Sequence, residues 1–297
     1  MSKRWALAAL VVFVVVDVIL IASVLRRQSD SVVAATGEDL SPTSTATSAP
    51  ATPDATATPE VVAAEPEALV FLAVARDNTV VRATRGACGS GEPAKFDFSS
   101  NTGKSFATRT IPVTQVLALR ADSGGAISLV GTDATCTPVG YTSPDGGQSW
   151  QQALTPAGWY FGPEGIKSVV SPTLTSKPGC DVLNMSAIND LLARVTCTSG
   201  TVMGSGDGGK KWTLVGTLTD VRAAVFPAPG NGMALAKFQG CAAQTFTTRN
   251  GGRDWTAAGC ITGEKAEAIA FNGTTLIAQV SGEIYTSTNK GTSWSQP

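Results

Sequence analysis

Residues 143–150 read SPDGGQSW, and four other stretches of this 297-residue chain have nearly the same spelling. Each copy has Ser or Thr at its first position, Asp or Asn at its third, Gly at its fifth and Trp or Phe at its eighth. The other copies are SSNTGKSF (99–106), SGDGGKKW (205–212), TRNGGRDW (248–255) and STNKGTSW (287–294). A pattern that returns along a chain predicts a repeated structural unit. We refer to the five copies as the octapeptides.

The spacing of the octapeptides predicts the type of repeat. Their first residues are separated by 44, 62, 43 and 39 positions, and roughly 40–50 residues is the length of one four-stranded propeller blade. After Glu67 the chain consists of short runs of Val, Leu, Ile, Ala and Thr divided by Gly, Asn, Asp and Pro, which are strand signals. We therefore expect residues 67–297 to form an all-β domain, a β-propeller with five blades.

The residue types of the octapeptides suit a hairpin turn. Side-chain oxygens at positions one and three can accept hydrogen bonds from backbone N–H groups, and Gly at position five permits a positive φ. The aromatic ring at position eight can pack between neighbouring strands. These structural roles are expected for Ser99, Asn101, Gly103, Phe106, Ser143, Asp145, Gly147, Trp150, Ser205, Asp207, Gly209, Trp212, Thr248, Asn250, Gly252, Trp255, Ser287, Asn289, Gly291 and Trp294.

The octapeptide resembles the Asp box, or BNR repeat, of sialidases, sortilin-type receptors and the photosystem II assembly factor family. In those families the box joins the third and fourth strands of a propeller blade. The resemblance covers about residues 68–297. It implies that the box residues are structural and lie at the periphery, away from the ligand-binding face. The last strand after Trp294 is short, so the run near Leu69–Val74 is expected to help complete the final blade.

The N-terminal part predicts a membrane anchor followed by a tether. Residues Trp5–Leu25 form an apolar run with one charge, Asp17, and match the ~20 residues that cross a bilayer as a helix. A cleaved signal peptide is the alternative, but its apolar region is usually shorter. Residues 28–66 are rich in Ser, Thr, Ala and Pro without aromatics, which is typical of a disordered linker. We expect a cytoplasmic tip and signal anchor over residues 1–27.

Asp17 leaves two interpretations open. A carboxylate inside a membrane costs a few kcal/mol or more unless it is paired or protonated. Pairing with a partner helix and protonation in a lone anchor explain it equally well.

The cysteines indicate the compartment of the domain. All six follow the apolar run, in an even number and without Cys-x-x-Cys pairs: Cys88, Cys136, Cys180, Cys197, Cys241 and Cys260. This pattern favours disulfides in an oxidising compartment over a zinc or redox site. We therefore expect a single-pass plasma-membrane protein whose C-terminal domain is extracytoplasmic.

The blade template that the resemblance implies also suggests disulfide pairs. It places Cys136, Cys197 and Cys241 at the start of third strands and Cys260 at the end of a fourth strand, which gives Cys241–Cys260. A hairpin turning near residues 189–190 would bring Cys180 to Cys197, and Cys88 and Cys136 then remain for each other. Six cysteines allow fifteen connectivities, and free buried thiols are the alternative.

An extra stretch lies between the second and third octapeptides. Residues 157–179 are expected to form an insertion or an elongated loop, and Trp159, Tyr160 and Phe161 make it an aromatic cluster outside the octapeptides. An exposed aromatic loop would be a candidate interaction surface. The alternative is that these rings fold over the propeller's own core.

Composition excludes several functions. The chain has no histidine and a net charge of −1, so the commonest general base and metal ligand is missing and no basic stripe suggests nucleic acid. No cofactor, metal or catalytic residue is expected. Five arginines are scattered over the domain, and of these Arg109 and Arg120 are candidate interaction residues; the others are Arg82, Arg85 and Arg222.

Three functions remain. A non-catalytic scaffold or assembly factor for a membrane or cell-envelope protein is the first, because the resemblance to photosystem II assembly factors implies this class. A glycan-binding receptor is the second. A sialidase-like glycoside hydrolase is the third, but that family's Arg-Ile-Pro signature precedes its first box, whereas here Arg109-Thr-Ile-Pro112 carries an inserted Thr and follows the first octapeptide. Arginines converging on the channel would favour an anionic ligand, and arginines on an outer rim a protein partner.

Overall fold

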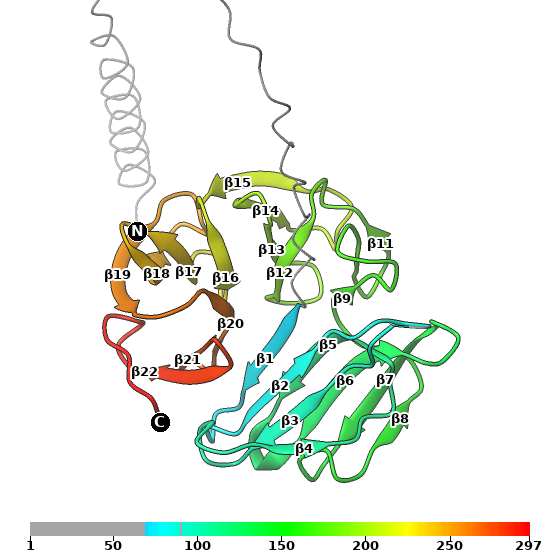
Figure 1. Ribbon diagram of the computed structural model, residues 1–297. Coiled ribbons are helices and arrows are strands. Elements are labelled where there is room, and N and C mark those ends of the chain that lie inside the picture. Colours follow the sequence, from blue (N-terminus) through cyan, green and yellow to red (C-terminus); the bar gives the residue numbers. More distant parts are fainter. Residues whose placement is uncertain (1–68, 90) are drawn as a thin grey trace, which may run out of the picture. The chain divides into compact units, whose positions relative to one another are not determined.

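The computed structural model describes residues 69–89 and 91–297, and these residues form six antiparallel sheets around a common centre (Figure 1). The domain is therefore an all-β propeller with six blades, and the expected number of five is wrong. In every blade the strands are hydrogen-bonded in chain order, with the first strand innermost. We number the blades in chain order.

Four blades have four strands. Blade one contains β1 (Val70–Val74), β2 (Val80–Thr84), β3 (Phe96–Ser99) and β4 (Ala107–Arg109). Blade two contains β5 (Gln115–Ala121), β6 (Ile127–Thr132), β7 (Pro138–Ser143) and β8 (Gln151–Ala153). Blade four contains β12 (Val182–Ala187), β13 (Ala193–Cys197), β14 (Thr201–Ser205) and β15 (Thr213–Thr217). Blade five contains β16 (Val221–Val225), β17 (Gly232–Phe238), β18 (Cys241–Thr248) and β19 (Thr256–Ile261).

Blades three and six have three strands each. Blade three is built from β9 (Tyr160–Phe161), β10 (Val169–Val170) and β11 (Thr175–Ser176), all only two residues long. The stretch expected to be an insertion is therefore a small blade without an octapeptide, which is why counting octapeptides gave one blade too few. Blade six contains β20 (Ala266–Phe271), β21 (Leu276–Val280) and β22 (Glu283–Ser287).

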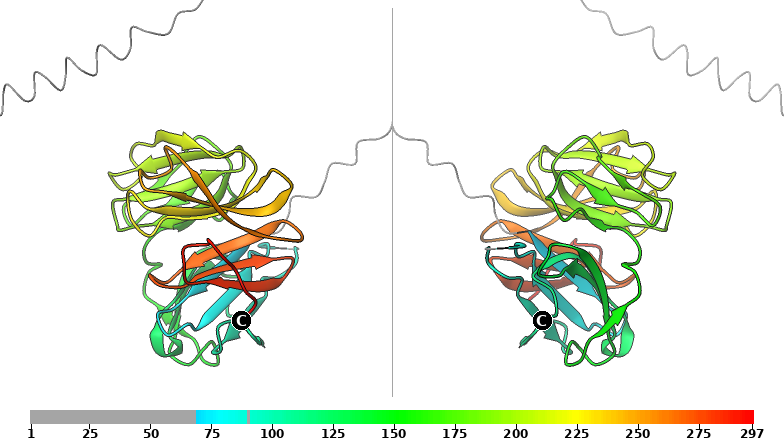
Figure 2. Two further views of the ribbon diagram at one scale, coloured as in Figure 1. Left: turned by 90° about the vertical axis from the view of Figure 1, so that its left-hand side faces the viewer. Right: turned by 90° about the vertical axis from the view of Figure 1, so that its right-hand side faces the viewer.

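The ring closes by side-chain packing between blades one and six. Strand β1 is the innermost strand of blade one, so the expectation that this run completes the final blade is wrong. At the edge of blade six, Thr286 forms an isolated β-bridge with Ser295. Val74 and Val80 share a buried cluster with Ala270, Ile277 and Ile284. The first and last blades, cyan and red, accordingly lie side by side in both side views (Figure 2).

Two polar side chains cross the same closure. Asn272 Nδ2 donates to the carbonyl oxygen of Ala75 at 2.8 Å, and Arg82 Nη1 donates to that of Gly282 at 2.9 Å. Arg82 also pairs with Asp97 at 3.0 Å and lies over the Phe106 ring, 4.1 Å from its centroid. Arg82 and Asn272 therefore add polar contacts to the closure between blades one and six.

The five octapeptides share one hydrogen-bond pattern. In each, the hydroxyl at position one accepts from the N–H of the Gly at position five at 2.8–3.0 Å. The same hydroxyl donates to the Asp or Asn Oδ1 at position three, and that Oδ1 accepts from the N–H of position seven. All five glycines have φ between 79° and 101°, a range that a β-carbon would oppose.

Each octapeptide also packs on the third strand of the preceding blade. The α-carbon of Gly147 lies so close to β3 that an added β-carbon would be 2.9 Å from the Phe96 ring. Gly103 approaches Ile284 of β22, Gly209 approaches Ser176 of β11, and Gly252 approaches Val202 of β14 in the same way. Gly291 lies closest of all, against Thr245 of β18. The octapeptide therefore joins neighbouring blades as well as two strands of its own blade.

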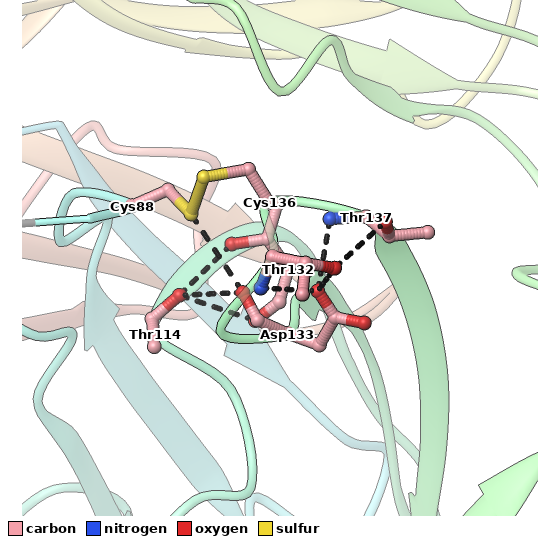
Figure 3. The surroundings of a disulfide bond; sticks show 7 residues. Cys88, Thr114, Thr132, Asp133, Cys136 and Thr137 are labelled. Carbon is pink, nitrogen blue, oxygen red and sulfur yellow. Dashed lines mark hydrogen bonds between the residues drawn. A yellow bond between two sulfur atoms is a disulfide. The ribbon is translucent and has the colours of Figure 1, made fainter.

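Three disulfides are present: Cys88–Cys136, Cys180–Cys197 and Cys241–Cys260. These are the pairs suggested from the blade template, although Cys197 ends a second strand instead of starting a third. Cys88–Cys136 links the β2–β3 loop of blade one to the β6–β7 loop of blade two. Figure 3 shows its Cys88 sulfur beside the carbonyl oxygen of Asp133, at 3.7 Å.

The segments predicted to be a membrane anchor (1–27) and a linker (28–66) lie outside the described residues. Within residues 69–89 and 91–297, no helix is long and apolar enough to span a bilayer.

Candidate functional site

A cavity of ≈ 390 Å³ occupies the centre of the ring. It is bounded by the innermost strands of all six blades, which surround the middle of Figure 1. The lining consists of residues 69–74, 117–122, 183–187, 224–227 and 268–271, together with Trp159 and Phe161. The volume lies within the ~300–1,000 Å³ that is typical of small-ligand pockets.

The cavity lies toward the face that carries the octapeptides. Its lining takes residues from the C-terminal ends of β5, β12, β16 and β20. The hairpins that follow β5, β12 and β16 are hydrogen-bonded to octapeptides. In each case a backbone N–H of the octapeptide donates to a carbonyl oxygen of the hairpin: Gly146 to Gly125, Gly208 to Leu191 and Gly251 to Gly230. The cysteines of the loops between second and third strands lie at the opposite face, because the strands are antiparallel.

The small third blade forms one wall of the cavity with two aromatic rings. Trp159 and Phe161 are 2% and 4% exposed. Trp159 Nε1 donates to the carbonyl oxygen of Asn189 at 2.9 Å, and Phe161 meets Phe71 edge to face at 5.7 Å. Arg85, itself buried, lies over the Phe161 ring and donates to the carbonyl oxygen of Gly162 at 3.0 Å.

Four of the residues that line the cavity have polar side chains, and polar atoms make up more of its exposed surface than apolar atoms. Asn184 Oδ1 accepts from the N–H of Ala224 at 2.9 Å, and Ser186 Oγ accepts from the N–H of Phe226 at 3.0 Å. These two bonds join β12 to β16 across a blade boundary. Arg120 and Asp122, near the end of β5, are both exposed. The remainder is Leu, Ile, Val, Ala, Met, Phe, Trp and Pro.

The cavity has few groups for acid–base or metal chemistry. Among the described residues that line it, Asp122 is the one carboxylate, and the described part of the chain contains no cluster of three potential metal ligands. The shifted carboxyl groups lie in turns instead. Hydrogen bonds from Ser149 hold the pKa of Asp145 at about 2, and the N–H of Gly124 lowers the pKa of Asp77.

The residues proposed for interaction do not form one surface. Trp159 and Phe161 are buried, so the folded-over alternative applies to them, and Tyr160 is half-buried, which raises the pKa of its phenol. Arg109 ends β4, the outermost strand of blade one, whereas Arg120 belongs to β5 at the centre. Only Arg120 of these five keeps an exposed polar group at the cavity.

Sequence reasoning missed Asn184 and Ser186. They stand two residues apart in LNMSA, a pattern that marks one side of a strand. That pattern is too common to identify a site without knowing that β12 is an innermost strand.

Comparisons with known proteins give structural matches alone. No family model and no curated protein matches the chain. A solved YCF48 bound to a D1 peptide is 17% identical, over 77% of this chain and 66% of that one, with a TM-score of 0.31. A GH74 xyloglucanase from Xanthomonas campestris is 15% identical, over 76% of this chain and 37% of that one, with a TM-score of 0.33.

A lectin from Aleuria aurantia in complex with a fucosylated sugar is 9% identical, over 77% of this chain and 94% of that one, with a TM-score of 0.46. The chain thus spans less than two thirds of the first two proteins. At these identities and TM-scores the matches establish no function. The chain is a six-bladed β-propeller with recurring octapeptides, and a photosystem II assembly factor and glycoside hydrolases of the propeller class are among the solved structures it resembles.

Proposed function

We propose that this propeller is a non-catalytic interaction module that receives part of a protein partner in its central cavity. The observation that carries the proposal is the cavity itself, ≈ 390 Å³ in volume, which is lined by residues of all six blades, four of them with polar side chains. Cavities of this volume with a few placed polar side chains are typical of binding sites. Only one of the five arginines considered above, Arg120, reaches this cavity.

The chemistry of the cavity supports binding over hydrolysis. Most glycoside hydrolases use two carboxyl groups that flank the scissile bond. In the part of the chain that the structure describes, the cavity offers Asp122 alone, and that side chain is exposed at its rim.

The proposal includes a place of action outside the cytoplasm. Three disulfides support an oxidising compartment. The apolar segment 5–25 would hold the domain at the membrane, and the partner would be a membrane or cell-envelope protein.

Site-specific photocrosslinking tests the proposal. A diazirine analogue of leucine is placed at Leu119, which lines the cavity, or at Leu214, which is 64% exposed on the outermost strand β15. After irradiation of intact cells, we expect a protein adduct from position 119 and none from position 214. The adduct is identified by mass spectrometry and its partner is purified.

Binding of that purified partner provides the second measurement. Leu119→Arg should weaken binding at least tenfold, while the matched Leu214→Arg should leave it unchanged. Adducts from position 214 alone, or a sugar adduct at 119, would contradict the proposal.

A further inference from the structure

The octapeptides carry the excess positive charge of the domain. Positions one, three, five and eight build the turn, and the other four positions vary from copy to copy. Six residues at these variable positions are basic, and we call them the basic arc: Lys104, Lys210, Lys211, Arg249, Arg253 and Lys290. The octapeptides contain three carboxylates, whereas the rest of residues 69–297 contains twelve basic and twelve acidic residues. Outside the octapeptides the charges of the domain therefore balance.

The side chains of the basic arc are exposed and unpaired. All six are exposed, and within residues 69–89 and 91–297 none of them has an ion-pair partner within 4.0 Å. The octapeptide carboxylates are instead bonded inside their own turns. Oδ1 of Asp145 and of Asp207 accepts from the N–H at position seven, and Asp254 Oδ2 accepts from Asn250 Nδ2 at 2.7 Å. The positive charges are therefore the ones that remain available to a ligand.

The fold places these dispersed residues on one face of the ring. Each octapeptide follows the third strand of its blade, so all five lie at the same face. Blades four, five, six and one follow one another around the ring, and the octapeptide of each has a net charge of +1. The octapeptide of blade two has a net charge of −1, and blade three has no octapeptide. The contacts of Gly252, Gly291 and Gly103 pack the four positive blades onto one another.

An exposed leucine lies beside the basic arc on the same face. Leu191 is 55% exposed in the hairpin between β12 and β13. Its carbonyl oxygen accepts from the N–H of Gly208, in the octapeptide of blade four, at 2.9 Å. Lys210 and Lys211 belong to the same octapeptide. An apolar side chain next to basic residues is typical of surfaces that bind the interface of an anionic bilayer.

The distribution of the charges favours an extended ligand. None of the six basic residues is among the described residues that line the central cavity, so the basic arc does not gather its charges around one small anion. A ligand that contacts four blades at once has to present many negative charges on a broad surface. An apolar side chain such as Leu191 gains from that contact where the surface also offers hydrocarbon.

From this arrangement we infer that the octapeptide face docks on an anionic lipid bilayer. The basic arc contacts the lipid phosphate groups, and Leu191 enters the boundary between headgroups and acyl chains. The central cavity, which lies toward the same face, then opens toward the bilayer. The inference goes beyond the proposed function, because contact with lipid requires no partner in the cavity.

Photocrosslinking to lipid tests the inference. The full chain carries p-benzoylphenylalanine in place of Leu191, or in place of Phe238, which is 40% exposed at the opposite face. Each protein is mixed with vesicles of phosphatidylcholine alone, or of phosphatidylcholine and phosphatidylglycerol in equal parts, and irradiated. We expect lipid adducts from position 191 with the anionic vesicles, far fewer with the neutral ones, and none from position 238. Residues 5–25 are the same in both proteins, so insertion of that segment affects both equally.

Position six of the octapeptide provides matched variants. Gln148 occupies this position in blade two, so the turn accepts glutamine there. Lys104→Gln, Lys210→Gln and Arg253→Gln should leave the Tm unchanged and each weaken docking about fivefold, as expected for one basic residue at an anionic surface. Their combination should remove nearly all lipid adducts. Lys237→Gln, exposed at the opposite face, is the control and should change nothing.

Three outcomes would overturn the inference. Equal adducts from neutral and anionic vesicles would show that the contact does not depend on charge. Adducts as abundant at position 238 as at position 191 would show that no face is preferred. Absence of lipid adducts at position 191 would show that this face does not touch lipid, and binding of poly-glutamate in calorimetry would then assign the basic arc to an acidic protein segment. The proposed function fails separately, when position 119 gives no protein adduct.

Discussion

Blade three packs against its neighbouring blades through different contacts from those that the other five blades use. Five blades carry an octapeptide that packs on the third strand of the blade before it. Blade three has none, and at its junction with blade two Gly140 of β7 faces Thr155 and Pro156 of the connecting chain instead. Five hydrophobic clusters span the other five blade junctions, whereas none of the clusters within the described residues spans the junction of blades two and three.

Blade three is stabilised mainly by the packing of its aromatic rings. Its rings belong to a cluster shared with blade four, and Phe161 also contacts Phe71 of blade one near the central cavity. The aromatic rings therefore attach blade three to blade four and to β1, whereas its contact with blade two, through β5 and β9, includes none of these hydrophobic clusters. Its large aromatic side chains thus provide packing on the side of blade four, opposite the side where an octapeptide would pack.

The largest effect is expected when Trp159, the buried ring of blade three, is truncated. Trp159→Ala should lower the free energy of unfolding by about 3–5 kcal/mol, because the side chain is almost fully buried. Trp150→Ala, in the octapeptide of blade two, should cost less because Trp150 is only half-buried. Urea unfolding followed by circular dichroism measures both. A greater loss for Trp150→Ala would mean that the octapeptides hold the ring more strongly than blade three's rings do.

A smaller loss of stability is expected when the octapeptide glycine is replaced. This glycine both adopts a positive φ and allows close contact with the preceding blade, and a matched pair of variants separates the two contributions. Gly147→Ala forces a β-carbon both into a positive φ and against Phe96, whereas Gly240→Ala has a similar φ of 85° and no atom within 4 Å. The φ alone costs about 1–2 kcal/mol, and crowding adds about 1–3 kcal/mol. Gly147→Ala should therefore be the more destabilising in thermal unfolding. Equal losses would show that the contact between blades contributes nothing.

The smallest expected effect is a loss of stability at low pH, when Asp145 becomes protonated. The pKa of Asp145 is held at about 2, below its ordinary 3.8, so its charged form stabilises the fold above about pH 4 and this contribution is lost as the pH falls through about 2. Asp145→Asn should keep the turn, since Asn101, Asn250 and Asn289 make the equivalent bonds. The difference in Tm between the wild type and the variant should therefore narrow between pH 4 and pH 2. A difference that stays constant with pH would assign Asp145 no such role.

The sequence predicts the parts of the fold that depend on local chemistry. The hydroxyl, the amide or carboxylate, and the glycine of each octapeptide act within eight residues, so their spelling is sufficient to predict the turn. Blade three was not predicted, because its strands are two residues long and give no periodic pattern. The interval of 62 residues between the second and third octapeptides was the one signal in the sequence that indicated an additional blade.

The cavity could not be predicted because it depends on which residues of six distant strands face the centre. Four of the innermost strands, β5, β12, β16 and β20, have register shifts. A shift of one residue exchanges the two sides of a strand, so alternation alone cannot assign Asn184 or Ser186 to the cavity.

The disulfide between blades one and two has a mechanical consequence. If the domain is pulled at its two ends, the tension passes from Cys88 to Cys136 through the covalent bond, and the chain between them, a sequence separation of 48, carries none. At ~3.4 Å per residue, on the order of 160 Å of contour length stays hidden until the bond is reduced. Reduction of this one bond would therefore lengthen the fully stretched domain by that amount, even though the same number of blades unfolds.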